Sequence, residues 1–187
     1  MRLWPQKRRK KILLTAFIIV LALLVGVTGY FEWSVYREVE TETQVLNANG
    51  AKTAIVIYHP GLTDFAQNIT YTYAEALETR GWRVEIATAS PKAPTNLNAY
   101  SLLVLCWPIY DLNPGPTITN HLNRIGNLNG IDAVIITISG GLDPLNAKDA
   151  MNKNVGDANG NIIQSLSSSR SNRNLDDLRE EAAKLTP

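Results

Sequence analysis

The chain has 187 residues, enough for one domain of ordinary size with an additional segment, and its formal net charge is +1. Six of its 18 basic residues lie within residues 1–11, where no acidic residue occurs, so the rest of the chain carries 12 basic and 17 acidic side chains. Contacts to the phosphate backbone of a nucleic acid need a basic protein face, so the acidic composition of residues 12–187 excludes a nucleic-acid partner. The chain has a single cysteine, Cys106, which excludes an internal disulfide.

A run of twenty residues without a charge, 12–31, follows the basic N-terminal segment. A helix of that length spans roughly 30 Å, the thickness of the hydrocarbon core of a bilayer. Aromatic residues of the kind that lie at membrane interfaces flank the run: Trp4, Tyr30, Phe31 and Trp33. A cleaved signal peptide is the alternative, but the run is long for one and no A-x-A site follows it. The sequence therefore predicts an uncleaved transmembrane helix over residues 12–31, embedded in the lipid bilayer.

The charges on the two sides of this helix predict its orientation. The six basic residues precede it, whereas Arg37 is the only basic residue in the comparable stretch that follows. By the positive-inside rule, the N-terminus lies in the cytoplasm and the domain lies outside the cell membrane. Residues 32–51 are polar, with four glutamates followed by "NANG", and are expected to form a juxtamembrane stalk before a domain over residues 52–187.

Within residues 52–187, short apolar runs alternate with segments of helical periodicity. The predicted strands are 53–58, 82–87, 101–107, 131–138 and 160–167. The predicted helices are 64–79, 116–125, 143–155 and a last one capped by Asn174. Such alternation indicates an α/β fold with a parallel sheet and right-handed crossovers, in which ligands bind beyond the carboxyl ends of the strands.

The loop after the first predicted strand, "HPGLTD", has the ingredients of an anion site. The backbone N–H groups of Gly61, Leu62 and Thr63, together with the Thr63 hydroxyl, precede the start of a helix. The loop is too short for a G-x-x-x-x-G-K-[ST] nucleotide loop. The alternative is an ordinary strand-to-helix turn in which Thr63 caps the helix.

Two further loops at the same edge carry residues suited to a flat ligand. After the third strand, "CWPIYDLNPGP" places Tyr110 where it can lie against a ring. After the fourth, "ISGGLDP" has adjacent glycines that allow the backbone to approach a ligand closely. Taken alone, each of these two loops is better interpreted structurally: the first as core packing and the second as a plain turn into the next helix.

Taken together, the three loops resemble those of the flavodoxin-like family, and the resemblance covers residues 52–185. The matching stretches are the G-x-T end of a phosphate loop at Gly61-Leu62-Thr63, a P-x-Y loop at Pro108-Ile109-Tyr110 and a Gly-rich loop at Ser139-Gly140-Gly141. The resemblance implies a five-stranded parallel sheet in the order 2-1-3-4-5 and bound FMN, with its phosphate on the first loop and its ring between the other two.

The phosphate loop departs from the family in being one residue short. His59-Pro60 stand where hydroxyl residues are usual. A protonated His59 could replace part of the lost interaction, and the favoured alternative is a loop histidine in water or bonded to backbone.

The resemblance implies a membrane-anchored electron carrier or FMN-dependent oxidoreductase that passes electrons to a quinone or to a redox partner protein. The alternative is a flavin-free domain of the same fold that binds or assembles partners at the membrane. A yellow colour of the purified domain would separate the flavoprotein from the flavin-free domain, because bound flavin absorbs visible light and the polypeptide does not.

The remaining polar candidates are interpreted as structural. Cys106 lies in a predicted buried strand and is expected to be a core residue, and His121 is expected to pack or to lie at the surface. Two distant histidines and one cysteine have no metal-ligand spacing, so no metal is expected. Arg170 and Arg173 could meet a phosphate-bearing partner, but are interpreted as part of a solvated turn.

Overall fold

The computed structural model describes residues 6–110, 113–141, 145–171 and 174–187. The chain divides into two compact units, Met1–Ser34 and Val35–Pro187. Arg173 and the predicted start of the helix at 143 lie outside the described residues, as does Trp4.

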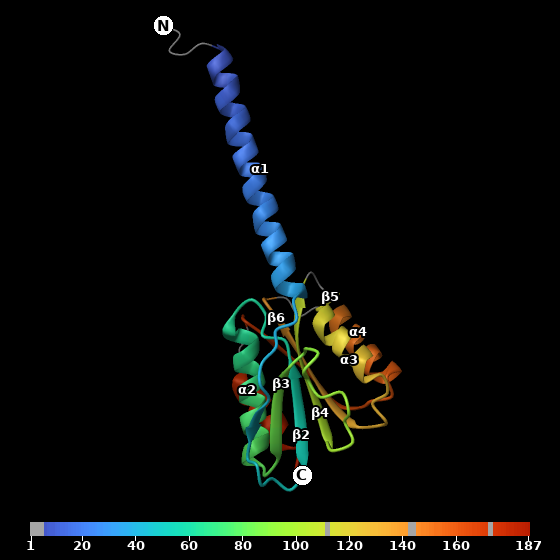
Figure 1. Cartoon of the computed structure of the whole chain (residues 1–187). Helices are drawn as coiled ribbons and strands as arrows, with labels where there is room; N and C mark the ends of the chain where they lie inside the picture. Colours follow the sequence, from blue (N-terminus) through green and yellow to red (C-terminus); the bar gives the residue numbers. More distant parts are fainter. Residues whose placement is uncertain (1–5, 111–112, 142–144, 172–173) are drawn as a thin grey trace. The chain divides into compact units, whose positions relative to one another are not determined.

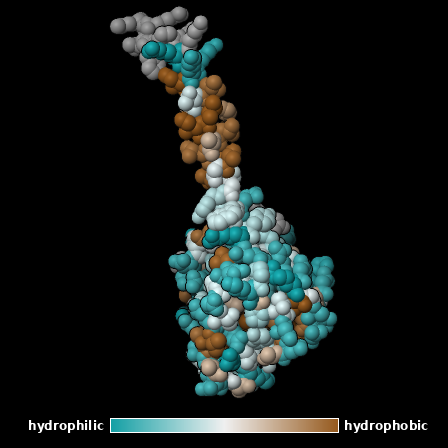
Figure 2. Space-filling model, in the orientation of Figure 1, coloured by the Kyte–Doolittle hydropathy of each residue, from teal (hydrophilic) through white to brown (hydrophobic). Residues whose placement is uncertain are grey.

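The first unit consists of most of helix α1 (Gln6–Tyr36), which is apolar over much of its length. Its segment Arg8–Tyr36 is long and apolar enough to cross a membrane, and Figure 2 shows the continuous band of hydrophobic residues. The large apolar side chains of this band, such as Leu13 and Phe17, are exposed. A helix that is apolar all round and has no protein packed on it is typical of a membrane span or of an N-terminal signal sequence.

The second unit is built on a mostly parallel sheet. Its parallel strands are β2 (Thr53–Tyr58), β3 (Arg83–Thr88), β4 (Leu102–Tyr110), β6 (Asp132–Ser139) and β7 (Asn161–Ser169). They lie in the order β3-β2-β4-β6-β7, which confirms the predicted 2-1-3-4-5 topology (Figure 1). The sheet has six strands rather than five, because β1 (Gln44–Leu46) pairs antiparallel with β3 at one edge. The two-residue β5 (Asn113–Pro114) pairs with the end of β4.

Helices cover both faces of the sheet (Figure 1). Helices α2 (Asp64–Thr79) and α5 (Leu175–Ala183) pack on one face, and α3 (Pro116–Ile125) and α4 (Leu145–Asp157) pack on the other. The central strands are buried on both sides, so successive residues of β2 such as Ile55 and Val56 enter opposite cores. This explains why the strands have continuous apolar sequences.

Cys106 is a core residue, as predicted. Its side chain is fully buried between the sheet and α2, where Thr70 interacts with the thiol. Burial raises the pKa of the Cys106 thiol to about 12, so the thiolate is not populated near neutral pH.

Residues 35–51 differ from the expected stalk, because they belong to the folded unit. The Thr88 hydroxyl donates to the Val39 carbonyl, and Arg124 pairs with Glu38 at 2.7 Å. Farther along, β1 covers the edge of β3. A three-residue strand in a polar segment carries too little periodicity to be recognised, and it forms here because β3 offers an unpaired edge.

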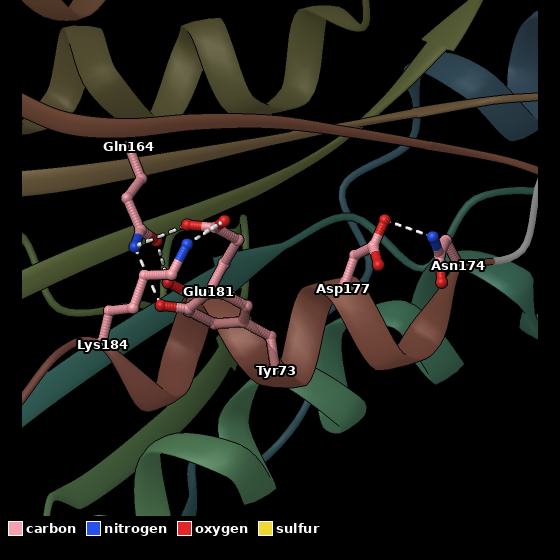
Figure 3. Close-up of polar contacts among 6 residues, drawn as sticks. All are labelled: Tyr73, Gln164, Asn174, Asp177, Glu181 and Lys184. Carbon is pink, nitrogen blue, oxygen red and sulfur yellow. Dashed lines mark hydrogen bonds and ion pairs between the residues drawn. The ribbon is translucent and has the colours of Figure 1, made fainter.

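A polar network fixes α5 to the sheet (Figure 3). The Tyr73 hydroxyl of α2 donates to Gln164 Oε1 at 2.6 Å, and Gln164 Nε2 donates to the Glu181 carbonyl at 2.9 Å. Burial raises the pKa of Tyr73, which keeps its hydroxyl protonated as this donor role requires. Asn174 occupies the N-cap position of α5, but its side chain donates to Asp177 and makes no capping hydrogen bond, so the predicted cap interaction is wrong.

The contacts of residues 35–51 predict that a fragment starting at Val35 is more stable than one starting at residue 52. The shorter fragment leaves the β3 edge unpaired and removes the carbonyl partners of His59 and Thr88. We expect its thermal midpoint to lie lower by roughly 5 °C or more. Circular dichroism melting of both fragments measures this, and equal midpoints would show that residues 35–51 add nothing to the fold.

Candidate functional site

The three loops identified in the sequence meet at the carboxyl end of the sheet and form a cleft of about 250 Å³. The predicted residues that line this cleft are Gly61, Leu62, Thr63, Pro108, Ile109, Tyr110, Ser139 and Gly140. His59 and Gly141 do not line it, whereas Phe65 and Arg170 do.

A cavity of about 330 Å³ lies beside residues 97–101 and 128–132, at the amino ends of the strands, where parallel sheets of this kind do not hold ligands.

The turn after β2 is closed by His59. The Gly61 N–H donates to His59 Nδ1 at 3.1 Å, so Nδ1 carries no proton, and Nε2–H donates to the Arg37 carbonyl at 3.2 Å. The ring is almost fully buried, and burial lowers its pKa, which favours this neutral tautomer. His59 is therefore held as a neutral ring by the turn itself and does not line the cleft, and its contact with a phosphate stays a prediction.

Gly61 adopts a left-handed backbone with φ of +73°, a conformation that glycine accepts without strain. A side chain here would place its Cβ 3.1 Å from the Tyr110 hydroxyl oxygen. Glycine is thus needed both for the turn and for the close approach of Tyr110.

Tyr110 ends β4, which runs three residues beyond its predicted end because Ile109 and Tyr110 pair with β5. Burial raises the pKa of Tyr110 to about 12, so the phenol stays neutral. One of the expected phosphate donors, the Gly61 N–H, is engaged by the His59 side chain of the protein itself.

Thr63 and Arg170 form the polar end of the cleft. Thr63 stands at the N-cap position of α2, but its side chain makes no capping bond and its Oγ1 accepts from Arg170 Nη2 at 2.7 Å. The Arg170 backbone N–H donates to the Ser139 carbonyl, and its guanidinium lies 6.0 Å from the centre of the Phe65 ring. Arg170 is thus a cation of the cleft rather than a residue of a solvated turn.

The position of Arg170 was recognisable in principle. It follows directly after the last parallel strand, and the carboxyl ends of parallel strands meet at one edge of a sheet. Arg170 was instead interpreted as part of a solvated turn, because β7 is polar and its end is poorly marked in the sequence.

The loop after β6 leaves open space at its glycines. A Cβ on Gly140 or on Gly141 would meet no described atom within 4 Å. The Gly141 carbonyl accepts from the Ser171 hydroxyl at 3.1 Å, which ties this loop to the segment that carries Arg170. Within the described residues, packing alone does not demand these glycines.

Both histidines of the chain are buried. His121 on α3 is fully buried, its Nδ1 lies 3.5 Å from Arg124 Nη2, and burial lowers its pKa to about 4. It packs within the domain and has no place in the cleft.

The lowered pKa values of His59 and His121 predict that the domain loses stability as the pH is lowered below neutral. Well above pH 6.5 both rings are neutral in the folded and the unfolded chain. As the pH falls through 6.5, the unfolded chain takes up protons that the folded chain resists, down to about pH 4 for His121. We expect the free energy of unfolding of the fragment 35–187 to fall by about 2 kcal/mol between pH 7 and pH 5. Urea unfolding at these pH values tests this, with His121→Asn reducing the slope. An unchanged free energy would contradict it.

Comparison with solved structures identifies the fold. A flavodoxin from the domain Archaea superposes with a TM-score of 0.61 at 9% identity, covering 71% of this chain and 94% of that one. The two-electron reduced flavodoxin of Megasphaera elsdenii gives 0.57 at 15% identity, covering 70% and 99%. Rubredoxin:oxygen oxidoreductase of Desulfovibrio gigas gives 0.60 at 9% identity, covering 71% of this chain and 35% of that one.

No protein-family model and no curated protein matches the chain. At these identities the likeness concerns the fold. The second unit of this chain has the flavodoxin-like fold, and its cleft lies where the loops after β2, β4 and β6 meet.

Proposed function

We propose that this chain is a membrane-anchored FMN protein that passes electrons to a quinone or to a redox partner protein. The observation that carries the proposal is the cleft itself. Three loops that resemble flavodoxin loops in sequence line one pocket at the carboxyl edge of a flavodoxin-like sheet. FMN, when bound, supplies one- and two-electron redox chemistry.

The residues of the cleft fit such a cofactor. Leu62, Ile109 and the Tyr110 ring give apolar walls that suit a flat aromatic ring and keep water from its face. Arg170 and Thr63 supply a cation and a hydroxyl at the polar end, which suits a phosphate. The open space at Gly140 leaves room for a ligand edge.

The first residues of the folded unit are bound at the carboxyl ends of two strands. The Arg37 and Val39 carbonyls are bound by His59 and by Thr88, which stand at the carboxyl ends of β2 and β3. The chain therefore enters the folded unit at the edge of the sheet that carries the cleft.

One observation favours the second candidate, a flavin-free binding module. The N–H group of Gly61 is already engaged inside the protein, so a phosphate that uses this donor would have to displace His59. Titration with FMN separates the two candidates.

The full-length protein in detergent is expected to quench FMN fluorescence on binding. Gly61→Val should weaken FMN binding by roughly tenfold or more, because a side chain there is strained and pushes against Tyr110. Gly130→Val is the matched control: Gly130 has a similar φ of +75° but faces open space at the other end of β6. Absence of FMN binding to the unmodified protein would favour the flavin-free module, and equal loss in both variants would place the site elsewhere.

The proposed topology has residues 1–11 in the cytoplasm, a span over 12–31 and the folded unit outside the cell membrane. It is supported by the six basic residues before the apolar run and the single Arg37 close behind it.

Protease added to intact spheroplasts should therefore degrade the folded unit while a cytoplasmic marker protein survives. Replacing the basic residues Lys7 to Lys11 by Gln, with lysines added after residue 31, should reverse the outcome, because the positive charges then flank the other end of the span. Full protection of the unmodified chain in spheroplasts would contradict the orientation.

A further inference from the structure

We propose that the phosphate of the flavin is recognised by Arg170 together with the Thr63 hydroxyl, in place of the Gly61 backbone N–H. The inference rests on the proposed function, because it assigns a subsite within the same cleft.

The first step is that one backbone donor of the loop, the Gly61 N–H, is taken. The Gly61 N–H is bound to His59 Nδ1, and the His59 ring is held from its other side by the Arg37 carbonyl. The ring is 1% exposed, so it cannot turn aside without opening the core.

The second step is the electrostatic position of Arg170. Its guanidinium binds Thr63, which stands directly before the first residue of α2, so a positive side chain lies at the positive end of a helix dipole. That juxtaposition is unfavourable by itself and becomes favourable when an anion lies between the two. Asp64 begins the helix, but within the described parts of the chain no ion pair joins Arg170 to Asp64 or to another acidic residue.

The third step is the donor geometry of the side chain. One guanidinium nitrogen of Arg170, Nη2, donates to Thr63 Oγ1 at 2.7 Å, and the planar fork has further N–H groups. Such a fork suits two-point recognition of phosphate oxygens. The Arg170 backbone N–H on the Ser139 carbonyl and the nearby Phe65 ring hold the residue at the cleft.

The experiment compares FMN with riboflavin, which has the same ring but no phosphate, on full-length protein in detergent. The unmodified protein should bind FMN at least roughly tenfold tighter than riboflavin, as expected of a charge-assisted contact. Arg170→Gln should remove this preference by weakening FMN binding while leaving riboflavin binding unchanged, and Arg170→Lys should restore part of it. Millimolar inorganic phosphate should compete with FMN, but not with riboflavin, in the unmodified protein only.

Arg179→Gln is the matched control, because it removes the same charge from an exposed position on α5. Riboflavin binding also reports whether each variant is folded. If Arg170→Gln weakens both flavins equally, or neither, the assignment of the phosphate to Arg170 is wrong while the flavin site stands. If the unmodified protein binds neither flavin, the proposed function and this inference fail together.

Discussion

The parallel pairing of β2 with β4 is the constraint on which the arrangement of the domain depends. The register from Ala54 opposite Leu102 to Tyr58 opposite Cys106 joins two strands that are buried on both faces. Because the strands run in the same direction, the loops after them must emerge side by side, and the connections must cross over the faces as helices. The contact between Gly61 and Tyr110, 49 positions apart in the sequence, is a direct result of this register.

The sequence predicted those parts of the fold that are set by local signals. The bounds of β2, α2 and α3 agree with the predicted ranges, because each is an apolar or periodic run with a clear stop such as Gly126. The parts it missed depend on distant partners. Strand β1 exists only against the edge of β3, and β4 extends to Tyr110 only because β5 pairs with it. Neither contact leaves a periodic trace in the residues concerned.

The cleft shows the same division. The glycine turn and the Pro108–Tyr110 stretch were recognisable from residue type and topology, whereas the roles of His59 and Arg170 were not. His59 takes its protonation state from a carbonyl 22 residues away, and Arg170 takes its position from a hydroxyl 107 residues away. Side-chain chemistry that is set by tertiary neighbours cannot be assigned from spacing alone, even when the loop is correctly located.

The burial of Cys106 has a consequence for the reactivity of its thiol. A thiol that is fully enclosed and stays protonated near neutral pH is neither a nucleophile nor a target for oxidants. No second cysteine exists in the chain, so neither bridge formation nor bridge exchange within it can alter the fold. Alkylating reagents can reach this sulfur only when the sheet and α2 separate. The rate at which Cys106 is labelled would therefore report the rate or the frequency of opening of the domain, and the single cysteine is a natural probe of unfolding.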